Sequence, residues 1–123
     1  MTTTFADYAA QQEARESISA AVLKHTLSLC EALRQNFIDH NNGSDGGYNF
    51  YSETGRKYHK IVMETWSGSR SVHCFIDKKT GEVYKPASFK APAKGVRFDL
   101  RIIEQREWLF ENADWAGSYL YAR

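Results

Sequence analysis

The sequence predicts an α+β fold, in which an antiparallel β-meander of three to five strands packs against a long N-terminal helix and a short C-terminal helix follows. Two observations support this prediction. Apolar residues recur every three or four positions through residues 18–37, which is the spacing of one helix face. Short aromatic and β-branched runs then alternate with glycine-containing turns through residues 48–87. The length of 123 residues predicts a single domain, residues 1–123, that needs no disulfide or metal to form a core.

The first segment, residues 5–40, is predicted to be helical. Thr4 has the side chain of an N-cap, and Asp7 would lie in the first turn, where a negative charge is favourable. The run DHNNGSDGG at residues 39–47 is rich in turn-forming residues and should end the helix. The buried face is expected to hold Ile18, Val22, Leu23, Thr26, Leu27, Leu29, Cys30, Leu33 and Phe37.

The β-meander is predicted within residues 48–87. Strand-like runs occur at residues 48–52, 57–66, 70–76 and 82–85. A two-residue turn at Ser67 and Gly68 would pair Ile61 with Cys74 and Val62 with His73. In that register one face of the sheet is apolar and meets the helix, and it holds Ile61, Met63, Val72, Cys74 and Ile76. The other face is mixed, and it is either solvated or covered by the C-terminal segment.

The rest of the chain is predicted to hold a loop, a helix and a tail. Residues 87–98, called the basic loop below, lack periodicity and contain Pro92, which predicts an extended loop. Residues 99–123 are predicted to hold the C-terminal helix and the tail. Asp99 would cap a helix covering residues 101–112, and the alternating residues 118–121 could form a terminal strand.

No motif in the sequence identifies a catalytic or metal centre. The four histidines lack HxxxH and HxH spacing, and the two cysteines form no CxxC. His73 and Cys74 are adjacent, but successive residues of a regular strand point to opposite faces. Neither GxGxxG nor GxxxxGK[ST] occurs. We therefore predict a protein that is not an enzyme and uses no metal or cofactor, in which Cys30 and Cys74 are buried free thiols.

Charge is distributed unevenly along the chain. Residues 1–55 carry 3 basic and 7 acidic side chains, whereas residues 56–106 carry 12 basic and 5 acidic ones. Residues 107–123 are acidic again, and the net charge of the whole chain is +1. The basic middle predicts attraction to an anionic partner. The N-terminal residues lack the basic and apolar regions of a signal peptide and no apolar run is long enough to span a membrane, so we expect a soluble protein without a membrane partner.

Two runs of the sequence carry a family resemblance. They are RSVHCFIDKKTGEVYKPASFKAPAKGVRFDL at residues 70–100 and DWAGSYLYAR at residues 114–123. These runs resemble a family of small proteins of tailed bacteriophages, including phages of marine bacteria, and the similarity covers residues 48–123. The family has no assigned activity. The resemblance therefore implies a phage origin and the cytoplasm of the host, but it implies no mechanism.

The basic loop and its flanks provide the candidate binding site. Residues 78–106 contain eight Lys and Arg side chains with aromatic residues interleaved. The candidate binding residues are Lys85, Phe89, Lys90, Lys94 and Arg97. Basic groups bind phosphates and carboxylates, and an aromatic ring stacks on bases or anchors a contact. The opposing interpretation is structural: Phe89 packs the loop onto the sheet and the lysines keep a hairpin edge soluble.

Two classes of function therefore remain open. The favoured prediction is a non-enzymatic interaction module that acts on a host or phage macromolecule. The alternative is a nucleic-acid-binding protein that uses residues 78–106. We also predict a homodimer or a larger assembly, because a β-meander leaves two exposed edges.

Overall fold

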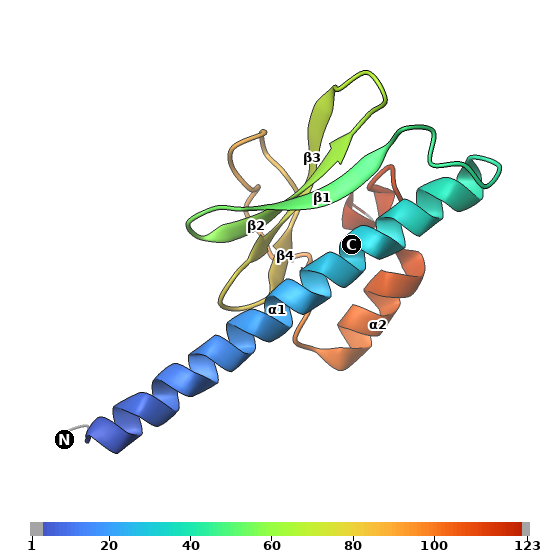
Figure 1. Ribbon diagram of the computed structural model, residues 1–123. Helices are drawn as coiled ribbons and strands as arrows, with labels where there is room; N and C mark the ends of the chain where they lie inside the picture. The colour runs from blue at the N-terminus through green and yellow to red at the C-terminus, as the bar shows by residue number, and fades with distance from the viewer. Residues whose placement is uncertain (1–3, 122–123) are drawn as a thin grey trace.

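A computed structural model describes residues 4–121 and confirms the α+β fold (Figure 1). A long N-terminal helix precedes a five-stranded antiparallel sheet whose strands follow one another in the order β1-β2-β3-β4-β5. The elements are α1 (Phe5–His40), β1 (Asn49–Thr54), β2 (Tyr58–Glu64), β3 (Arg70–Asp77), β4 (Glu82–Tyr84), β5 (Phe98–Asp99), α2 (Ile103–Asn112) and the 3-10 helix η1 (Ser118–Tyr121). This order confirms the predicted meander between a long and a short helix.

Helix α1 begins and ends where its capping residues predict. The hydroxyl oxygen of Thr4 accepts a hydrogen bond from the backbone N–H of Asp7 at 3.1 Å, which satisfies one free donor of the first turn. The helix ends at His40, directly before the Asn- and Gly-rich run. Its buried residues are Val22, Thr26, Leu29, Cys30, Leu33 and Phe37, as the periodicity predicted.

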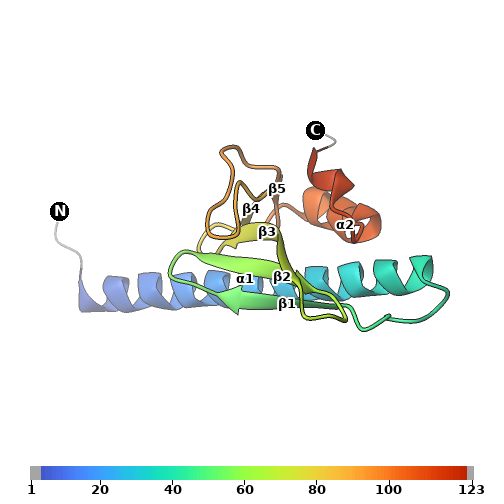
Figure 2. The ribbon, with the colours of Figure 1, turned by 90° about the horizontal axis from the view of Figure 1, so that it is seen from above.

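Leu23 and Leu27 do not belong to this buried face, contrary to the prediction. Their side chains are 38% and 49% exposed. Every residue of 5–17 is exposed as well, and both ribbon views show this part of α1 standing clear of the sheet (Figures 1 and 2). We call residues 5–17 the N-terminal arm. The sheet does not extend to the arm, so the apolar residues of the arm remain exposed, whereas Leu23 and Leu27 are exposed because they lie on a side of α1 that is turned away from its buried face.

One face of the sheet, the inner face, packs against α1. Phe50, Ile61, Cys74 and Ile76 from the first three strands join Leu29 and Leu33 of α1 in one buried cluster, together with Val83 of β4 and Phe98 of β5. All of these side chains are at most 5% exposed. Burial of this many large apolar groups is the main stabilising contribution to the fold.

The pairing of β2 with β3 contains a β-bulge that the sequence did not predict. Ile61 pairs with Cys74, as expected, but Val62 pairs with Val72 instead of His73. The register shifts between Ile61 and Val62, so β3 has one more residue than β2 at this point. The predicted Val62–His73 pair is therefore wrong, and Val72 moves to the opposite side of the sheet, called the outer face.

The bulge also turns His73 towards the core. Its ring contacts Phe50 of β1 and Tyr119 of η1, and both partners belong to the buried cluster. His73 and Cys74 thus lie on the same face, although adjacent residues of a regular strand would point apart. The expectation that the two side chains are separated by the sheet is wrong for this reason.

The C-terminal segment completes the inner core and not the outer face. Helix α2 packs beside α1 and buries Leu109, while Tyr119 and Leu120 of η1 join the cluster. Asp99 lies in β5 and does not cap α2, whose N-cap is Ile102. Residues 118–121 form a 3-10 turn and not the expected strand.

Candidate anion-binding surface

The basic loop folds back on itself between β4 and β5. Pro86 and Pro92 form an isolated bridge, and the backbone N–H of Ala93 donates to the carbonyl of Lys85 at 2.9 Å. The hydroxyl oxygen of Ser88 accepts from the backbone N–H groups of Lys90 and Ala91. The segment is therefore a closed turn and not the extended loop that its composition predicted.

The loop is held on the outer face by Phe89. The ammonium of Lys60 lies 4.2 Å from the centroid of the Phe89 ring, and the guanidinium carbon of Arg70 lies 5.5 Å from it. Such cation–π contacts contribute about 0.5–1 kcal/mol each at exposed sites. Phe89 thus packs the loop onto β2 and β3, as the structural interpretation predicted.

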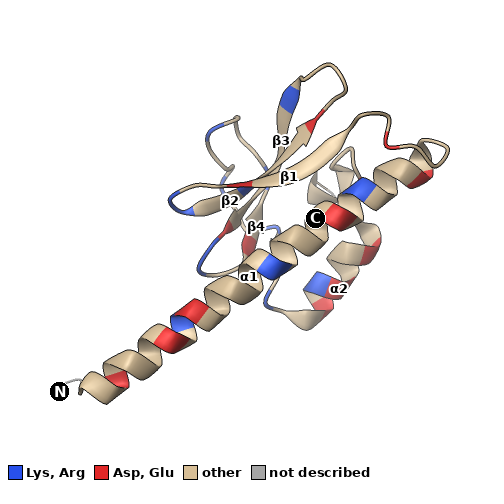
Figure 3. Cartoon of the chain, viewed as in Figure 1, with Lys and Arg blue, Asp and Glu red and all other residues tan. Residues whose placement is uncertain are grey.

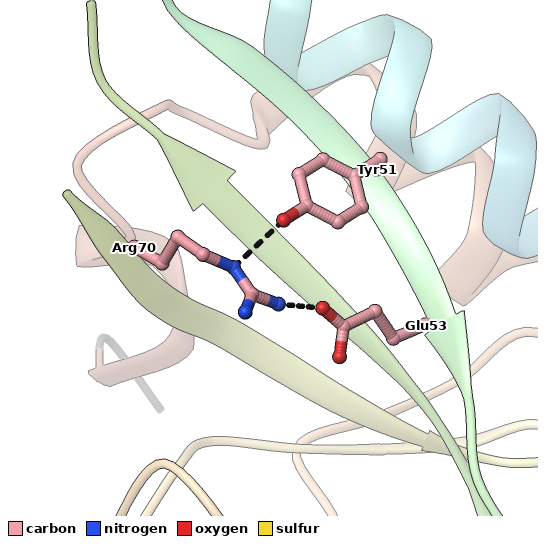
Figure 4. A network of polar contacts seen from close by, with 3 residues as sticks. All are labelled: Tyr51, Glu53 and Arg70. Atoms are coloured by element: carbon pink, nitrogen blue, oxygen red, sulfur yellow. Dashed lines mark hydrogen bonds and ion pairs between the residues drawn. The ribbon is translucent and has the colours of Figure 1, made fainter. Parts of the chain in front are cut away.

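Arg70 is itself fixed in place by β1. Its guanidinium forms an ion pair with Glu53, and its Nε donates to the hydroxyl of Tyr51 at 2.8 Å (Figure 4). The pair engages the carboxylate of Glu53, which would otherwise oppose the binding of an anion nearby. One acidic side chain of the outer face is thereby neutralised.

The five predicted binding residues do not converge on one spot. The ammonium of Lys85 lies 4.9 Å from the ring centroid of Tyr121, and the Nε of Arg97 donates to the carbonyl of Leu120 at 2.6 Å. Both therefore contact the C-terminal segment. Lys94 is exposed, and Lys90 is exposed at the rim of a hollow on the outer face.

This hollow brings together cations that are distant in the sequence. It has a volume of about 250 Å³, and it is lined by Glu53, Thr54, Gly55, Arg56, Lys57, Tyr58, Lys60, Phe75 and Lys90. Four of these residues are basic and one is acidic. Lys78 adds a further cation beside the hollow, because its ammonium donates to the carbonyl of Gly55 at 2.9 Å. We call Arg56, Lys57, Lys60 and Lys90 the cationic cluster.

Sequence reasoning found Lys90 but missed the other three members of the cluster. Arg56 and Lys57 occupy the β1–β2 turn, and Lys60 follows on β2. Lys60 pairs with Phe75, and Tyr58 lies two residues before it on the same face. The alternation of Tyr58 and Lys60 along the strand was the available signal. Lys90 joins these residues only because the basic loop folds over this face, which the sequence does not show.

Aromatic rings form the floor beside the cluster. The ring of Tyr58 contacts Phe75 and Tyr84 edge-to-face, at centroid distances of 5.8 Å and 6.0 Å. The ammonium of Lys57 lies 5.3 Å from the centroid of Tyr58, and a hydrogen bond with the Tyr58 side chain raises the pKa of Lys57. Lys57 therefore carries its charge at neutral pH. Cations over an aromatic floor can bind a phosphate or carboxylate and a flat ring in adjacent positions.

The buried side chains of His73, Cys30 and Cys74 lie in the core on the α1 side of the sheet, apart from this surface, and are poorly suited to chemistry. Burial lowers the pKa of His73 to about 4 and raises the pKa of Cys30 to about 12. Burial likewise raises the pKa of Cys74, so neither thiol forms a thiolate at neutral pH. Both cysteines are free, as predicted. Within residues 4–121, no three His, Cys, Asp or Glu side chains are grouped so that they could hold a metal ion.

Comparison with known proteins identifies a family. Residues 5–122 match the model of a family described as Family of unknown function (DUF7717). The chain belongs to this family. The DUF7717 match runs from the first residue of α1 through the sheet, the basic loop and α2, so it includes the whole cationic cluster. Neither the curated proteins nor the solved structures contain a match to the chain.

Between residues 4 and 121, no helix combines the length with the apolar character that crossing a bilayer requires.

Proposed function

We propose that this chain is a non-enzymatic binding module and that the outer face of its sheet binds single-stranded nucleic acid. The observation that carries the proposal is the cationic cluster, four basic side chains around one hollow with the ring of Tyr58 in its wall. Lys and Arg neutralise phosphates and release their counterions, and half-exposed rings stack on unpaired bases.

The size of the hollow favours a backbone contact over a nucleotide pocket. Pockets that enclose small molecules usually have volumes of about 300–1,000 Å³. The hollow, at about 250 Å³, is smaller than this range. A strand that follows the outer face would place successive phosphates at Arg56 and Lys57 and then at Lys60 and Lys90. The charge view supports such a path, because blue segments cluster on the turns and loops of the sheet (Figure 3).

The setting of this function is also a proposal. The resemblance to tailed-phage proteins supports the host cytoplasm as the compartment and a host or phage nucleic acid as the target. An acidic surface on a host protein is the competing partner, because carboxylates bind the same cations. The test is designed to separate the two.

Binding of fluorescently labelled single-stranded DNA and RNA, measured by anisotropy over a range of salt concentrations, tests the proposal. The site variant is Arg56→Gln with Lys57→Gln. If these two residues neutralise two phosphates, the slope of log affinity against log salt should flatten by about 1.4 units, because each phosphate contributes about 0.7 for single strands. The matched control is Lys79→Gln with Arg101→Gln, which removes the same charge from two exposed residues outside the hollow.

A second variant separates the cluster from the basic loop. Changing Lys85, Lys90 and Lys94 together to Gln removes the lysines that the sequence singled out. The site variant should lose more affinity for each charge removed than this loop variant, because only Lys90 of the loop lies at the hollow. Equal losses of affinity for the site variant and its control would show that binding depends on the overall charge of the protein and not on the hollow. Failure of the parent to bind any oligonucleotide, even at low salt, would refute the proposal and leave the acidic protein surface as the partner.

A further inference from the structure

Arg70 contacts three side chains of the outer face through one guanidinium. It forms an ion pair with Glu53, and its Nε donates to the hydroxyl of Tyr51 at 2.8 Å (Figure 4). Its guanidinium carbon also lies 5.5 Å from the ring centroid of Phe89 and 5.9 Å from that of Tyr51. Arg70 therefore joins its own strand, β3, to β1 and to the basic loop.

Glu53 is the acidic residue in the wall of the hollow. It pairs with Lys60 across β1 and β2, so its carboxylate would repel a phosphate that Lys60 holds. The ion pair with Arg70 offsets this repulsion, and the compensating charge comes from a residue outside the lining of the hollow. The cationic cluster therefore does not have to neutralise Glu53.

The same guanidinium helps to fix the basic loop beside the hollow. The ring of Phe89 lies between Arg70 and Lys60, whose ammonium is 4.2 Å from the ring centroid. Lys90 follows Phe89 directly in the chain and lines the hollow. A shift of the ring would therefore move Lys90 relative to Lys60. Holding Phe89 in place keeps these two members of the cationic cluster close together.

We infer that Arg70 is a positioning residue of the proposed nucleic-acid site. Arg70 does not touch the bound strand. It acts through Glu53, whose charge it offsets, and through Phe89, which it holds on the sheet. The inference rests on the proposed function, because it assigns a role at the same surface, and it adds a residue that lies outside both the sequence-predicted set and the cationic cluster.

The guanidinium group is suited to this role in a way that an ammonium is not. Its N–H donors are spread over a rigid plane, so one group can pair with a carboxylate and donate to a hydroxyl while it contacts a ring. A lysine ammonium has the same charge but is a compact point charge. Arg70→Lys therefore changes the contacts without changing the net charge. Exposed ion pairs contribute little to stability, so this variant should unfold at nearly the same urea concentration as the parent.

Anisotropy of labelled single-stranded DNA at one salt concentration measures the effect on binding. Arg70→Lys and Phe89→Leu should each weaken binding about two- to fivefold, the factor that corresponds to one exposed cation–π contact. The matched control is Arg101→Lys, because Arg101 is exposed and lies outside the hollow. This control should bind as tightly as the parent.

A double variant separates the positioning role from the charge. Arg70→Gln with Glu53→Gln has the net charge of the parent and removes the carboxylate that needs an ion pair. If Arg70 acted only through its charge, the double variant would bind like the parent. Because the contact with Phe89 is also lost, it should bind about two- to fivefold more weakly. Glu53→Gln alone keeps that contact and should not weaken binding.

Amide hydrogen exchange, followed by nuclear magnetic resonance without any ligand, tests the loop directly. The backbone N–H groups of Ala87 and Ala93 donate hydrogen bonds that close the turn of the basic loop. Arg70→Lys should speed the exchange of these two amides about two- to fivefold, because a loop that is held less firmly opens more often. The control Arg101→Lys should leave their exchange unchanged.

Two results would overturn the inference. The first is an affinity for DNA that Arg70→Lys leaves unchanged. The second is weaker binding of Arg70→Lys with unchanged amide exchange, which would make Arg70 a direct contact of the strand. If the parent binds no oligonucleotide, the proposed function fails by itself, and the same variants are compared with inorganic tripolyphosphate as the probe. A parent that binds neither probe would overturn both proposals.

Discussion

His73 and Tyr119 form a single buried polar unit. The Nε2 atom of His73 lies 2.6 Å from the hydroxyl of Tyr119, and the two rings stack with a centroid distance of 5.5 Å. The residues are 46 positions apart in the sequence, so this contact ties η1 to β3. Because burial lowers the pKa of His73 to about 4, the imidazole is neutral, and its Nε2 atom shares one hydrogen bond with the Tyr119 hydroxyl, whose direction follows the tautomer of the ring.

Removing the hydroxyl with Tyr119→Phe should destabilise the fold. The change keeps the ring but leaves a buried imidazole nitrogen without its partner, which costs about 1–3 kcal/mol. Urea unfolding followed by tryptophan fluorescence would measure the difference. Tyr121→Phe is the control, because the Tyr121 side chain is 58% exposed. That change should stay within about 0.5 kcal/mol of the parent. Equal effects of the two substitutions would contradict the assigned role of the hydrogen bond.

His73 should make the fold less stable in mild acid. The pKa of its side chain is about 4 in the folded chain and 6.5 when unperturbed, so between these two pH values the unfolded chain binds a proton that the folded chain does not. The free energy of unfolding should therefore fall as the pH drops below 6.5 and level off below about 4. The total loss from this residue is about 3 kcal/mol.

The measurement is urea unfolding at several pH values on the parent and on His73→Gln. The pKa values of His59 and His25 are also lowered, in both cases chiefly by burial, so the parent curve contains their contributions too. The difference between the two proteins isolates His73. A pH dependence that is the same with and without His73 would refute this assignment.

Cys30 and Cys74 should resist thiol reagents in the folded protein. Their side chains are 5% and 0% exposed, and burial raises both pKa values. Reaction with a coloured disulfide reagent should therefore proceed only as fast as the chain unfolds, and both thiols should react at once in denaturant. Rapid labelling of either cysteine under native conditions would show that the helix–sheet interface opens locally.

Two glycines allow a matched test of close packing. Gly81 and Gly68 both have positive φ, +78° and +86°. A Cβ at Gly81 would lie 3.1 Å from the Cγ of Arg101 and 3.4 Å from a methyl of Val22, whereas nothing lies within 4 Å at Gly68. Both alanine variants should lose about 1–2 kcal/mol from backbone strain, and Gly81→Ala should lose more. If thermal unfolding ranks the two variants in the opposite order, the packing around the β3–β4 turn differs from this description.

The sequence predicted the parts of the fold that depend on local chemistry. The Thr4 cap, the helix end at His40 and the positions of the first four strands all follow from periodicity and turn residues. The bulge at His73 was not visible, because its energy comes from the core contacts of His73 with Phe50 and Tyr119. From the sequence alone, strands whose side chains alternate regularly between the two faces fit residues 57–76 equally well.

The candidate site was only partly predictable for a similar reason. Lys90 was identified because it lies in a dense run of basic residues. Arg56 and Lys57 lie more than thirty positions earlier and meet Lys90 only because Phe89 packs between Lys60 and Arg70. Leu23 and Leu27 show the opposite limit: helix periodicity identifies the apolar residues but not how wide a face of the helix the sheet covers.

The length of α1 has a consequence for how the molecule tumbles in solution. A helix of 36 residues is about 54 Å long, whereas a compact chain of this size has a radius of gyration of about 14 Å. Rotation about the helix axis should therefore be faster than end-over-end rotation. The N–H bonds of α1 point along the helix axis, so only the slower end-over-end rotation reorients them, whereas the N–H bonds of the strands point in other directions. Nitrogen-15 relaxation should therefore distinguish the two groups of amides. The ratio of the transverse to the longitudinal relaxation rate should be higher for the amides of α1 than for those of the strands.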